Sequence, residues 1–333
     1  MRLGFSLSVV GDDADSLVRF AREAESLGFD SLWHGESWGS DAVVPLTWAA
    51  AATSRIAVGT DIMQIAGRTP ALAAMTAATL DDLSGGRMRL GLGVSGPQVV
   101  EGWHGQPYGR PLARTREYVQ VVREILRREA PLEFHGDYYD IPRRGPDATG
   151  LGKALKTILH PRADIPVYLA AIGPRNIALA LEIADGPLPI FWSCTQWTQC
   201  LPADSAIRPG FDIAPMVEVA CGDDLAACRD QVRPSIARYV GGMGARGKNF
   251  YNELTVRYGF ADAAARIQDA YLAGRQPDAI AAVPDELVDQ VALVGPREHI
   301  ADQLATWRQT PATTLILRTP QLEALRTLAE LVL

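Results

Sequence analysis

Short apolar segments alternate with longer segments of helical spacing along the whole chain, and this alternation is the feature that most restricts the fold. In the segment 112–128, Tyr118, Val121 and Ile125 recur on one face of a helix. Alternation of this kind predicts parallel strands covered by helices, an α/β fold. Eight strand units without a break in composition favour a (β/α)8 TIM barrel over an open doubly wound sheet. The eight predicted strands cover residues 2–8, 30–35, 55–63, 87–94, 166–171, 186–192, 211–220 and 313–318.

The length of 333 residues suits one such barrel, so we predict a single domain over 1–333. Two stretches interrupt the alternation. The segment 131–165 predicts a hairpin followed by a loop rich in glycine and proline, and the segment 240–294 is mostly helical in pattern. We expect both to be insertions at the C-terminal mouth of the barrel, the end at which such barrels carry their active sites.

Charge and composition exclude several classes of protein. The formal net charge of −7 argues against a nucleic-acid binder, which needs a basic face. No apolar run reaches the roughly 18 residues of a membrane span, and the first residues lack the layout of a signal peptide. The four cysteines form no C-x-x-C pair, which is typical of buried small side chains in a reducing compartment. We therefore expect a cytoplasmic protein with no nucleic-acid or membrane partner.

The end of the second strand segment carries a histidine and a carboxylate. Side chains alternate along a strand, so His34 and Glu36 share one face. Because a histidine and a carboxylate at a barrel mouth can exchange protons with a cofactor or substrate, we predict both as catalytic. The structural alternative is that His34 fills the barrel and Glu36 caps the next helix.

The fourth strand segment ends in GLGVSG at 91–96, which matches the dinucleotide fingerprint G-x-G-x-x-G. That fingerprint requires a helix directly after the motif. Pro97 follows at once, the sequence predicts no helix before about Leu112, and the motif lies in the fourth unit rather than the first. We therefore expect no Rossmann-type site. Instead, the glycines would let a planar ligand approach the backbone.

The fifth strand segment runs into a helix through Gly173, Pro174, Arg175 and Asn176. Proline suits the first helical turn, and the free N–H groups, the helix dipole and Arg175 together predict a phosphate site. The structural alternative is an ordinary tight turn.

Other chemistry has weaker support in the sequence. The five histidines are scattered and no H-E-x-x-H is present, so we predict no metal site; a G-x-S-x-G nucleophile motif is also absent. Several aromatic side chains near predicted strand ends and loops could wall a flat ligand: Trp103, His104, Tyr138, Tyr139, Trp192 and Trp197.

Taken together, the motifs resemble the bacterial luciferase-like superfamily, and most closely its branch that uses the deazaflavin coenzyme F420. The resemblance covers nearly the whole chain, but FMN-dependent members share the fold, so FMN is the alternative cofactor. The segments that carry the resemblance are SLW at 31–33, GLGVSGPQVVEGW at 91–103, DYY at 137–139, AAIGPR at 170–175, ADG at 184–186 and LVGP at 293–296.

The resemblance implies a cofactor at the C-terminal mouth and assigns residues to it. In the family, a non-proline cis peptide at the end of the third strand supports the deazaflavin ring, and the matching step here is Asp61-Ile62. The family's fourth-strand loop matches Val94, Ser95 and Gly96, and its phosphate turn matches Gly173, Pro174, Arg175 and Asn176.

The chain departs from the family pattern at the second strand. Family dehydrogenases often carry Asp-His there, whereas the matching pair here is Glu36-Ser37. A second departure is at the fourth strand, where Gly96 replaces an acidic residue that some relatives use. The resemblance still implies an F420-dependent oxidoreductase that transfers a hydride between the deazaflavin and an unidentified small organic substrate. The alternatives are an FMN-dependent monooxygenase and a non-catalytic flavin-binding protein. The family resemblance also implies a homodimer. We expect apolar residues of two helices to form the contact between the subunits: Leu46, Trp48, Leu72 and Met75.

Overall fold

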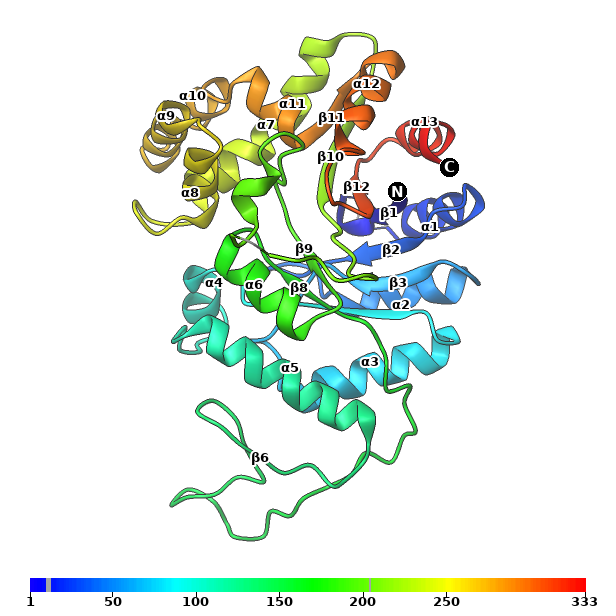
Figure 1. Cartoon of the computed structure of the whole chain (residues 1–333), viewed down its shortest axis with the longest axis vertical. Helices are drawn as coiled ribbons and strands as arrows, with labels where there is room; N and C mark the ends of the chain where they lie inside the picture. The colour runs from blue at the N-terminus through cyan, green and yellow to red at the C-terminus, as the bar shows by residue number, and fades with distance from the viewer. Residues whose placement is uncertain (10–12, 204) are drawn as a thin grey trace.

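Parallel strands form the centre of the molecule, as the sequence predicts. The computed structural model describes residues 1–9, 13–203 and 205–333 (Figure 1). Along the sheet, β12, β1, β2, β3, β5, β8 and β9 are neighbours in this order, and every pair is parallel. The eight barrel strands are β1 (Arg2–Ser6), β2 (Ser31–His34), β3 (Ala57–Thr60), β5 (Met88–Gly93), β8 (Val167–Ala170), β9 (Gly186–Leu188), β10 (Met216–Cys221) and β12 (Thr314–Arg318).

The sheet closes on itself between β9 and the chain that leads into β10. Ile190 and Met216 form a parallel bridge, and β10 also pairs with β12. Three N–H groups from one side donate to carbonyls of the other: Asp212 to Asp185 (3.0 Å), Ala214 to Pro187 (3.1 Å) and Met216 to Pro189 (2.9 Å). The predicted (β/α)8 barrel is therefore confirmed.

Helices cover the outside of the barrel where the sequence pattern turns amphipathic. Helix α1 buries Phe20, Ala21 and Ala24, and the Asp13 side chain caps it by accepting the N–H of Ser16 at 2.7 Å. None of the helices within the described ranges is long and apolar enough to cross a membrane. The covering helices are α1 (Ala14–Ser26), α2 (Val43–Ala52), α3 (Pro70–Ser84), α5 (Pro111–Arg127), α6 (Pro174–Ile183), α12 (Arg297–Trp307) and α13 (Leu322–Val332).

Short elements join these units. Both termini lie on the same side of the barrel, where α13 packs beside α1 (Figure 1). An ion pair between Arg326 and Glu23 (2.7 Å) links the two helices. The remaining short elements are η1 (Leu7–Val9), β4 (Met63–Gln64), α4 (Pro97–Gly102) and η2 (Trp197–Cys200).

The second predicted insertion lies over the mouth, as expected. The Tyr258 hydroxyl, just after α8, donates to the Phe191 carbonyl at 2.9 Å, and Phe191 follows the C-terminal end of β9. The sequence analysis missed the strand that closes this segment, β11, because its four residues follow a helix without a turn signal. The insertion contains α7 (Leu225–Gly242), α8 (Phe250–Arg257), α9 (Ala261–Leu272), α10 (Gln276–Ala281), α11 (Asp285–Val291) and β11 (Ala292–Gly295), which pairs with β10.

The first predicted insertion does not lie at the mouth. It joins the end of α5 to the start of β8, so it begins and ends at the N-terminal ends of the strands, where Arg162 pairs with Asp81 of α3 at 3.0 Å. Its hairpin folds back along α5, with Glu117 accepting the N–H of Asp137 at 2.9 Å. Figure 1 shows this loop beyond α5, far from α8 and α9. The hairpin itself, β6 (Phe134–His135) and β7 (Asp140–Ile141), is as predicted.

Candidate functional site

A bulge after β3 forms one side of the barrel mouth. The Asp61 N–H donates to the His34 carbonyl (2.9 Å), and the Glu36 N–H donates to the Ile62 carbonyl (3.1 Å). On the other side, the Ile65 N–H donates to the Gly93 carbonyl at 3.0 Å. The bulge is therefore held between the ends of β2 and β5. Its Asp61–Ile62 peptide bond is cis, as the family resemblance implies.

Glycines make room for this bulge. A Cβ atom at Gly35 would overlap the Asp61 carbonyl, and one at Gly91 would overlap the Thr60 carbonyl oxygen. A Cβ at Gly93 would lie 2.5 Å from Cδ1 of Ile62. The glycines of the fourth strand thus admit the protein's own backbone and side chains, which corrects the expectation that they mainly admit a planar ligand.

Asp61 directs a carboxyl group inward at this point. Its Oδ2 accepts the Ser6 hydroxyl at 2.9 Å, while its Oδ1 is shielded from solvent and has no hydrogen-bond partner among the described residues. Burial raises the pKa of Asp61 to about 7, and the Ser6 hydroxyl and the positive charge of Arg318 oppose this rise only in part. The structure therefore places a carboxyl group that titrates near neutral pH at the C-terminal end of β3.

Glu36 is tied into the backbone of its surroundings. Its carboxylate accepts the N–H of Gln64 (2.7 Å) and the N–H of Ala42 (3.2 Å), the N-cap residue of α2, and it pairs with Arg68. Arg68 also pairs with Asp41. Both carboxylate oxygens are thus engaged. Asp41, not Glu36, accepts the first N–H groups of α2, those of Val43 and Val44. The bonds of Glu36 nevertheless fit a structural role better than the catalytic role.

His34 is buried at the end of β2, with 6% of its surface exposed. Its backbone carbonyl accepts the Asp61 N–H, so it lies next to the bulge. The catalytic assignment of His34 remains a prediction.

The loop after β5 differs from its prediction in one respect. Val94, Ser95 and Gly96 are half-buried, and Ser95 has the left-handed backbone angle φ of +65°. A short helix, α4, begins directly after them, with Gly96 as its N-cap residue and Pro97 in its first turn. The expectation that no helix opens before Leu112 is therefore wrong. The Rossmann assignment nevertheless fails, because the fold is a closed barrel.

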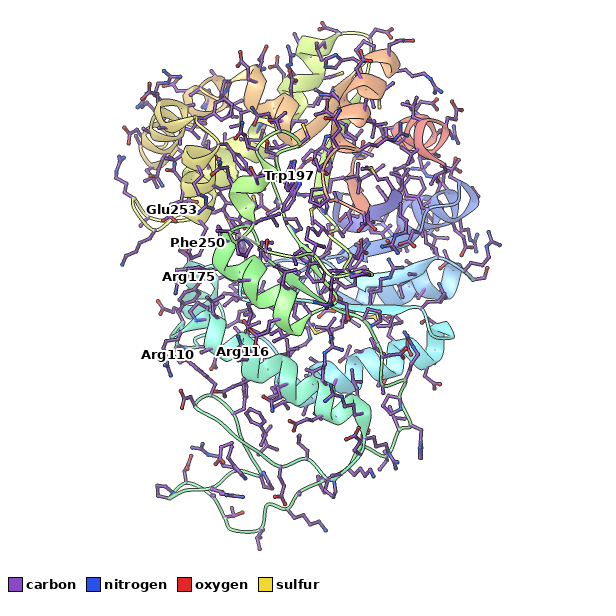
Figure 2. The ribbon with its side chains drawn as sticks, in the orientation of Figure 1. Arg110, Arg116, Arg175, Trp197, Phe250 and Glu253 are labelled. Carbon is purple, nitrogen blue, oxygen red and sulfur yellow. The ribbon has the colours of Figure 1, made fainter. Side chains whose placement is uncertain are left out.

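The four residues predicted to bind a phosphate form the start of α6. Gly173 is its N-cap residue, Pro174 occupies the first turn, and the Ile177 N–H donates to the Gly173 carbonyl at 2.9 Å. Arg175 is exposed (Figure 2), and it makes no ion pair within the described part of the chain. The predicted residues 173–176 therefore lie together at the helix N-terminus.

A second arginine joins this turn from the insertion. A Cβ at Gly173 would lie 3.3 Å from a terminal nitrogen of Arg257, which is the last residue of α8. Arg257 is also exposed and, within 1–9, 13–203 and 205–333, has no carboxylate partner. No sequence signal identifies Arg257, because its neighbour in space is 84 positions away along the chain and only the folding of the insertion brings them together.

Three aromatic side chains that the sequence analysis did not single out gather between the end of β9 and the insertion. The rings of Phe191, Tyr239 and Tyr251 meet edge to face at centroid distances of 4.8–6.0 Å. They come from the end of β9 and from α7 and α8. We call these three residues the aromatic cluster.

The predicted aromatic wall is wrong in part, although His104 lies near the bulge, where its Nε2 meets Oε1 of Gln64 at 2.9 Å. Tyr138 and Tyr139 pack along α5, where Tyr139 meets Tyr118 at a centroid distance of 5.8 Å. Trp192 is buried and Trp103 is largely exposed. For Tyr138 and Tyr139 the prediction is wrong because the hairpin packs against the first turns of α5, where Arg110 and Arg114 donate to their hydroxyl groups.

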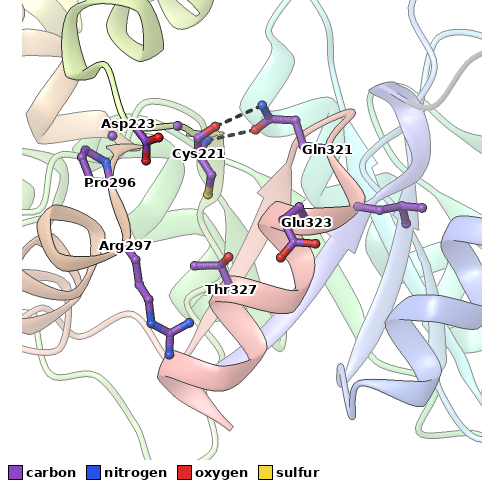
Figure 3. Close-up of a pocket in the computed structure, with 10 residues that line it drawn as sticks. Cys221, Asp223, Pro296, Arg297, Gln321, Glu323 and Thr327 are labelled. Carbon is purple, nitrogen blue, oxygen red and sulfur yellow. Dashed lines mark hydrogen bonds between the residues drawn. The ribbon is translucent and has the colours of Figure 1, made fainter.

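A separate cavity of about 370 Å³ lies between the ends of β10 and β11 and helices α12 and α13 (Figure 3). The Gln321 side chain forms one wall by accepting the Cys221 N–H (2.9 Å) and donating to the Cys221 carbonyl (3.2 Å), and Arg297 and Glu323 bring opposite charges. None of the site residues above lines it, so it is distinct from the candidate site.

Comparisons with known proteins agree with this geometry. The family model described as luciferase-like monooxygenase matches residues 1–314. The chain is 43% identical to a Mycobacterium tuberculosis protein named "Putative coenzyme F420-dependent oxidoreductase", over 100% of this chain and 99% of that protein. It is 32% identical, over 56% of this chain and 55% of the relative, to the F420-dependent glucose-6-phosphate dehydrogenase of Kineococcus radiotolerans.

Solved structures share the fold at low sequence identity. The coenzyme F420-dependent tetrahydromethanopterin reductase of Methanopyrus kandleri superposes with a TM-score of 0.77 at 22% identity, covering 99% of this chain and 98% of that one. An F420-dependent secondary alcohol dehydrogenase, solved with an F420–acetone adduct, superposes with a TM-score of 0.75 at 17% identity and the same coverage of both chains. With a family model that spans residues 1–314 and a closed barrel of the same architecture, this chain belongs to the luciferase-like monooxygenase family.

Proposed function

We propose that the chain is a coenzyme F420-dependent oxidoreductase that transfers a hydride between the deazaflavin and a small organic substrate. The observation that carries the proposal is the start of α6, where Arg175 lies in the first turn, the Arg257 guanidinium lies beside Gly173, and neither has an ion pair with a described residue. Relatives whose names specify F420 support the choice of cofactor, foremost the 43% identical mycobacterial protein that matches over its full length.

The residues present fit such a cofactor. A phosphate group would lie at the N-terminus of α6, where the helix dipole and the two arginines favour an anion. The flat ring would lie toward the bulge at Asp61 and Ile62. Because β3, β5 and β8 are neighbours in the sheet, both regions lie on the same rim of the barrel. The half-buried loop of Val94, Ser95 and Gly96 follows β5, between them.

When bound, the deazaflavin supplies or accepts the hydride at its C5 atom. The chain positions the reactants and keeps water away from them. The aromatic cluster and α8 cover the mouth from one side, and Glu36 fixes the bulge through its bond to the Gln64 N–H. We assign Glu36 a positioning role rather than a proton-transfer role, because its oxygens are fully engaged by Ala42, Gln64 and Arg68.

The test combines anaerobic turnover with binding. Oxidised F420 with 2-propanol and reduced F420 with 2-cyclohexen-1-one probe the two directions of hydride transfer. Consumption of F420 in either assay without oxygen supports the proposal. Turnover that requires FMN and oxygen would instead identify the FMN-dependent monooxygenase alternative, and tight binding without any turnover would identify the non-catalytic alternative.

Arginine variants test the phosphate site. A charge-assisted contact contributes about 1.5–3 kcal/mol, so Arg175→Ala and Arg257→Ala should each weaken F420 binding by about 10- to 100-fold. Arg266→Ala is the matched control, because Arg266 is equally exposed on α9 and has no described ion pair. Unchanged affinity in both site variants would show that the phosphate binds elsewhere.

We also propose a homodimer that forms through α2 and α3. Of the residues predicted for the contact, Leu46 is fully buried inside the protein and cannot contribute. The others belong to an exposed apolar surface that we call the α2–α3 face: Val44 (69% exposed), Trp48 (58%), Leu72 (47%), Met75 (55%) and Leu83 (73%). A mass of two chains by light scattering at micromolar concentration would support the dimer, and a mass of one chain would oppose it.

A further inference from the structure

We infer that Asp61 is the proton-carrying group of the reaction, donating a proton to the substrate when a hydride is added and accepting it in the reverse direction. The inference rests on the proposed function and extends it to a residue that neither the sequence motifs nor the family resemblance assigned to proton transfer. It adds a proton-transfer candidate beside His34, whose assignment remains a prediction, and in place of Glu36, whose carboxylate is engaged by Ala42, Gln64 and Arg68.

The geometry isolates one oxygen of Asp61. Oδ2 accepts the Ser6 hydroxyl from β1 at 2.9 Å, which fixes the orientation of the carboxyl group. Oδ1 is shielded from solvent and has no protein partner in the described residues. It lies on the side of Gly35, where a Cβ atom would be 3.0 Å from it. A carboxyl group with one oxygen anchored and one uncommitted can release or take up a proton at the free oxygen.

Among the described residues, the side-chain hydrogen bond to the Asp61 carboxyl group comes from the neutral Ser6 hydroxyl of β1. His34 ends β2, with its carbonyl accepting the Asp61 N–H, and Gly35 follows it against Asp61. The positive charge that lowers the pKa of Asp61 is that of Arg318 at the end of β12, which pairs with Glu218 at 3.2 Å. Glu218 in turn accepts the Ser235 hydroxyl of α7 at 3.0 Å. Burial therefore dominates and raises the pKa of Asp61 to about 7, so both protonation states are populated at neutral pH.

The bound deazaflavin would supply a hydride, that is two electrons and one proton nucleus, to an unsaturated carbon, for example a carbonyl carbon. The carbon–oxygen double bond becomes a single bond, and its electron pair leaves a negative charge on the oxygen. That oxygen takes the proton from Asp61, which becomes a carboxylate bonded to Ser6. Water returns the proton to Asp61 after the product leaves.

The first test needs no cofactor. Infrared titration of the protein alone should show the stretching band of a protonated carboxyl group that disappears with a midpoint near pH 7. Asp61→Asn should abolish this band, and Asp164→Asn, at an exposed carboxyl of the opposite end, should leave it unchanged. Ser6→Ala should move the midpoint to higher pH, because the Ser6 hydroxyl favours the carboxylate. Absence of any Asp61-dependent band between pH 5 and 7 would overturn the inference.

The second test concerns turnover of the probe, 2-propanol or 2-cyclohexen-1-one. Loss of a general acid–base group lowers kcat by about 100-fold or more, so Asp61→Asn should lower kcat by that factor and lose the pH inflection near 7. Unchanged kcat and pH profile in Asp61→Asn would refute the inference and leave the proposed function standing. If the wild-type protein neither binds nor turns over F420, the proposed function fails, whereas the infrared titration still reports on the Asp61 proton.

Discussion

Replacing Glu36 by glutamine tests whether this residue holds the site together or transfers protons. The side chains of Glu36 and Arg68 are only 10% and 14% exposed, so Glu36→Gln breaks a buried ion pair. Breaking a buried ion pair lowers the free energy of unfolding by about 3–5 kcal/mol. Arg68 keeps Asp41 as a partner, and glutamine keeps one oxygen for the N–H of Gln64 or Ala42. We therefore expect the lower end of that range, about 3 kcal/mol of unfolding free energy.

Urea unfolding with a common m-value measures this loss. The control is Asp147→Asn, which removes an exposed ion pair with Arg143 (64% exposed on each side) and should cost less than about 1 kcal/mol. Because the Glu36 carboxylate holds the Gln64 N–H next to the bulge, F420 affinity should fall together with stability. A Glu36→Gln protein of wild-type stability and affinity that has lost only turnover would refute the positioning role and restore the catalytic one.

Three further outcomes follow from the same structure. Because the pKa of Asp61 is raised from 3.8 to about 7 in the folded protein, the unfolded state loses the Asp61 proton at lower pH than the folded state does. The free energy of unfolding of the wild type therefore falls as the pH rises from 3.8 to about 7. Asp61→Asn should match the wild type near pH 4 and exceed it above pH 7 by up to about 4 kcal/mol in urea unfolding. Gly91→Ala should lower the free energy of unfolding by about 3 kcal/mol or prevent folding, since its Cβ would overlap the Thr60 carbonyl. As the control, Gly102→Ala should leave thermal unfolding unchanged, because a Cβ atom there meets nothing within 4 Å. Trp48→Glu should give a protein with the mass of one chain by light scattering, because it places a charge in the α2–α3 face.

The barrel could be predicted because its strands are apolar runs bounded by clear turn signals. Each of the eight predicted segments contains a barrel strand or its start, and Gly173-Pro174 marks the beginning of α6 as expected. The cis bond at Asp61–Ile62 was implied only by the family resemblance. Local sequence alone does not determine it, because the bulge depends on hydrogen bonds to β2 and β5.

The parts that sequence reasoning missed depend on contacts between distant segments. The short helix α4 has six residues, too few for a periodic pattern, and β11 is defined by its pairing with β10. The hairpin at 134–141 was predicted, but its location follows from Glu117 and Arg162, whose partners are 20 and 81 positions away along the chain. Arg257 reaches Gly173 only through the fold of the insertion.

Cofactor selectivity tests the central claim most directly. Fluorescence titration of the purified protein with F420 and, separately, with FMN compares the two cofactors on one site. We expect dissociation constants in the micromolar range or tighter for F420 and much weaker binding for FMN, with F420 binding weakened in Arg175→Ala and Arg257→Ala. Equal affinity for the two cofactors, or FMN that copurifies at full occupancy, would contradict it.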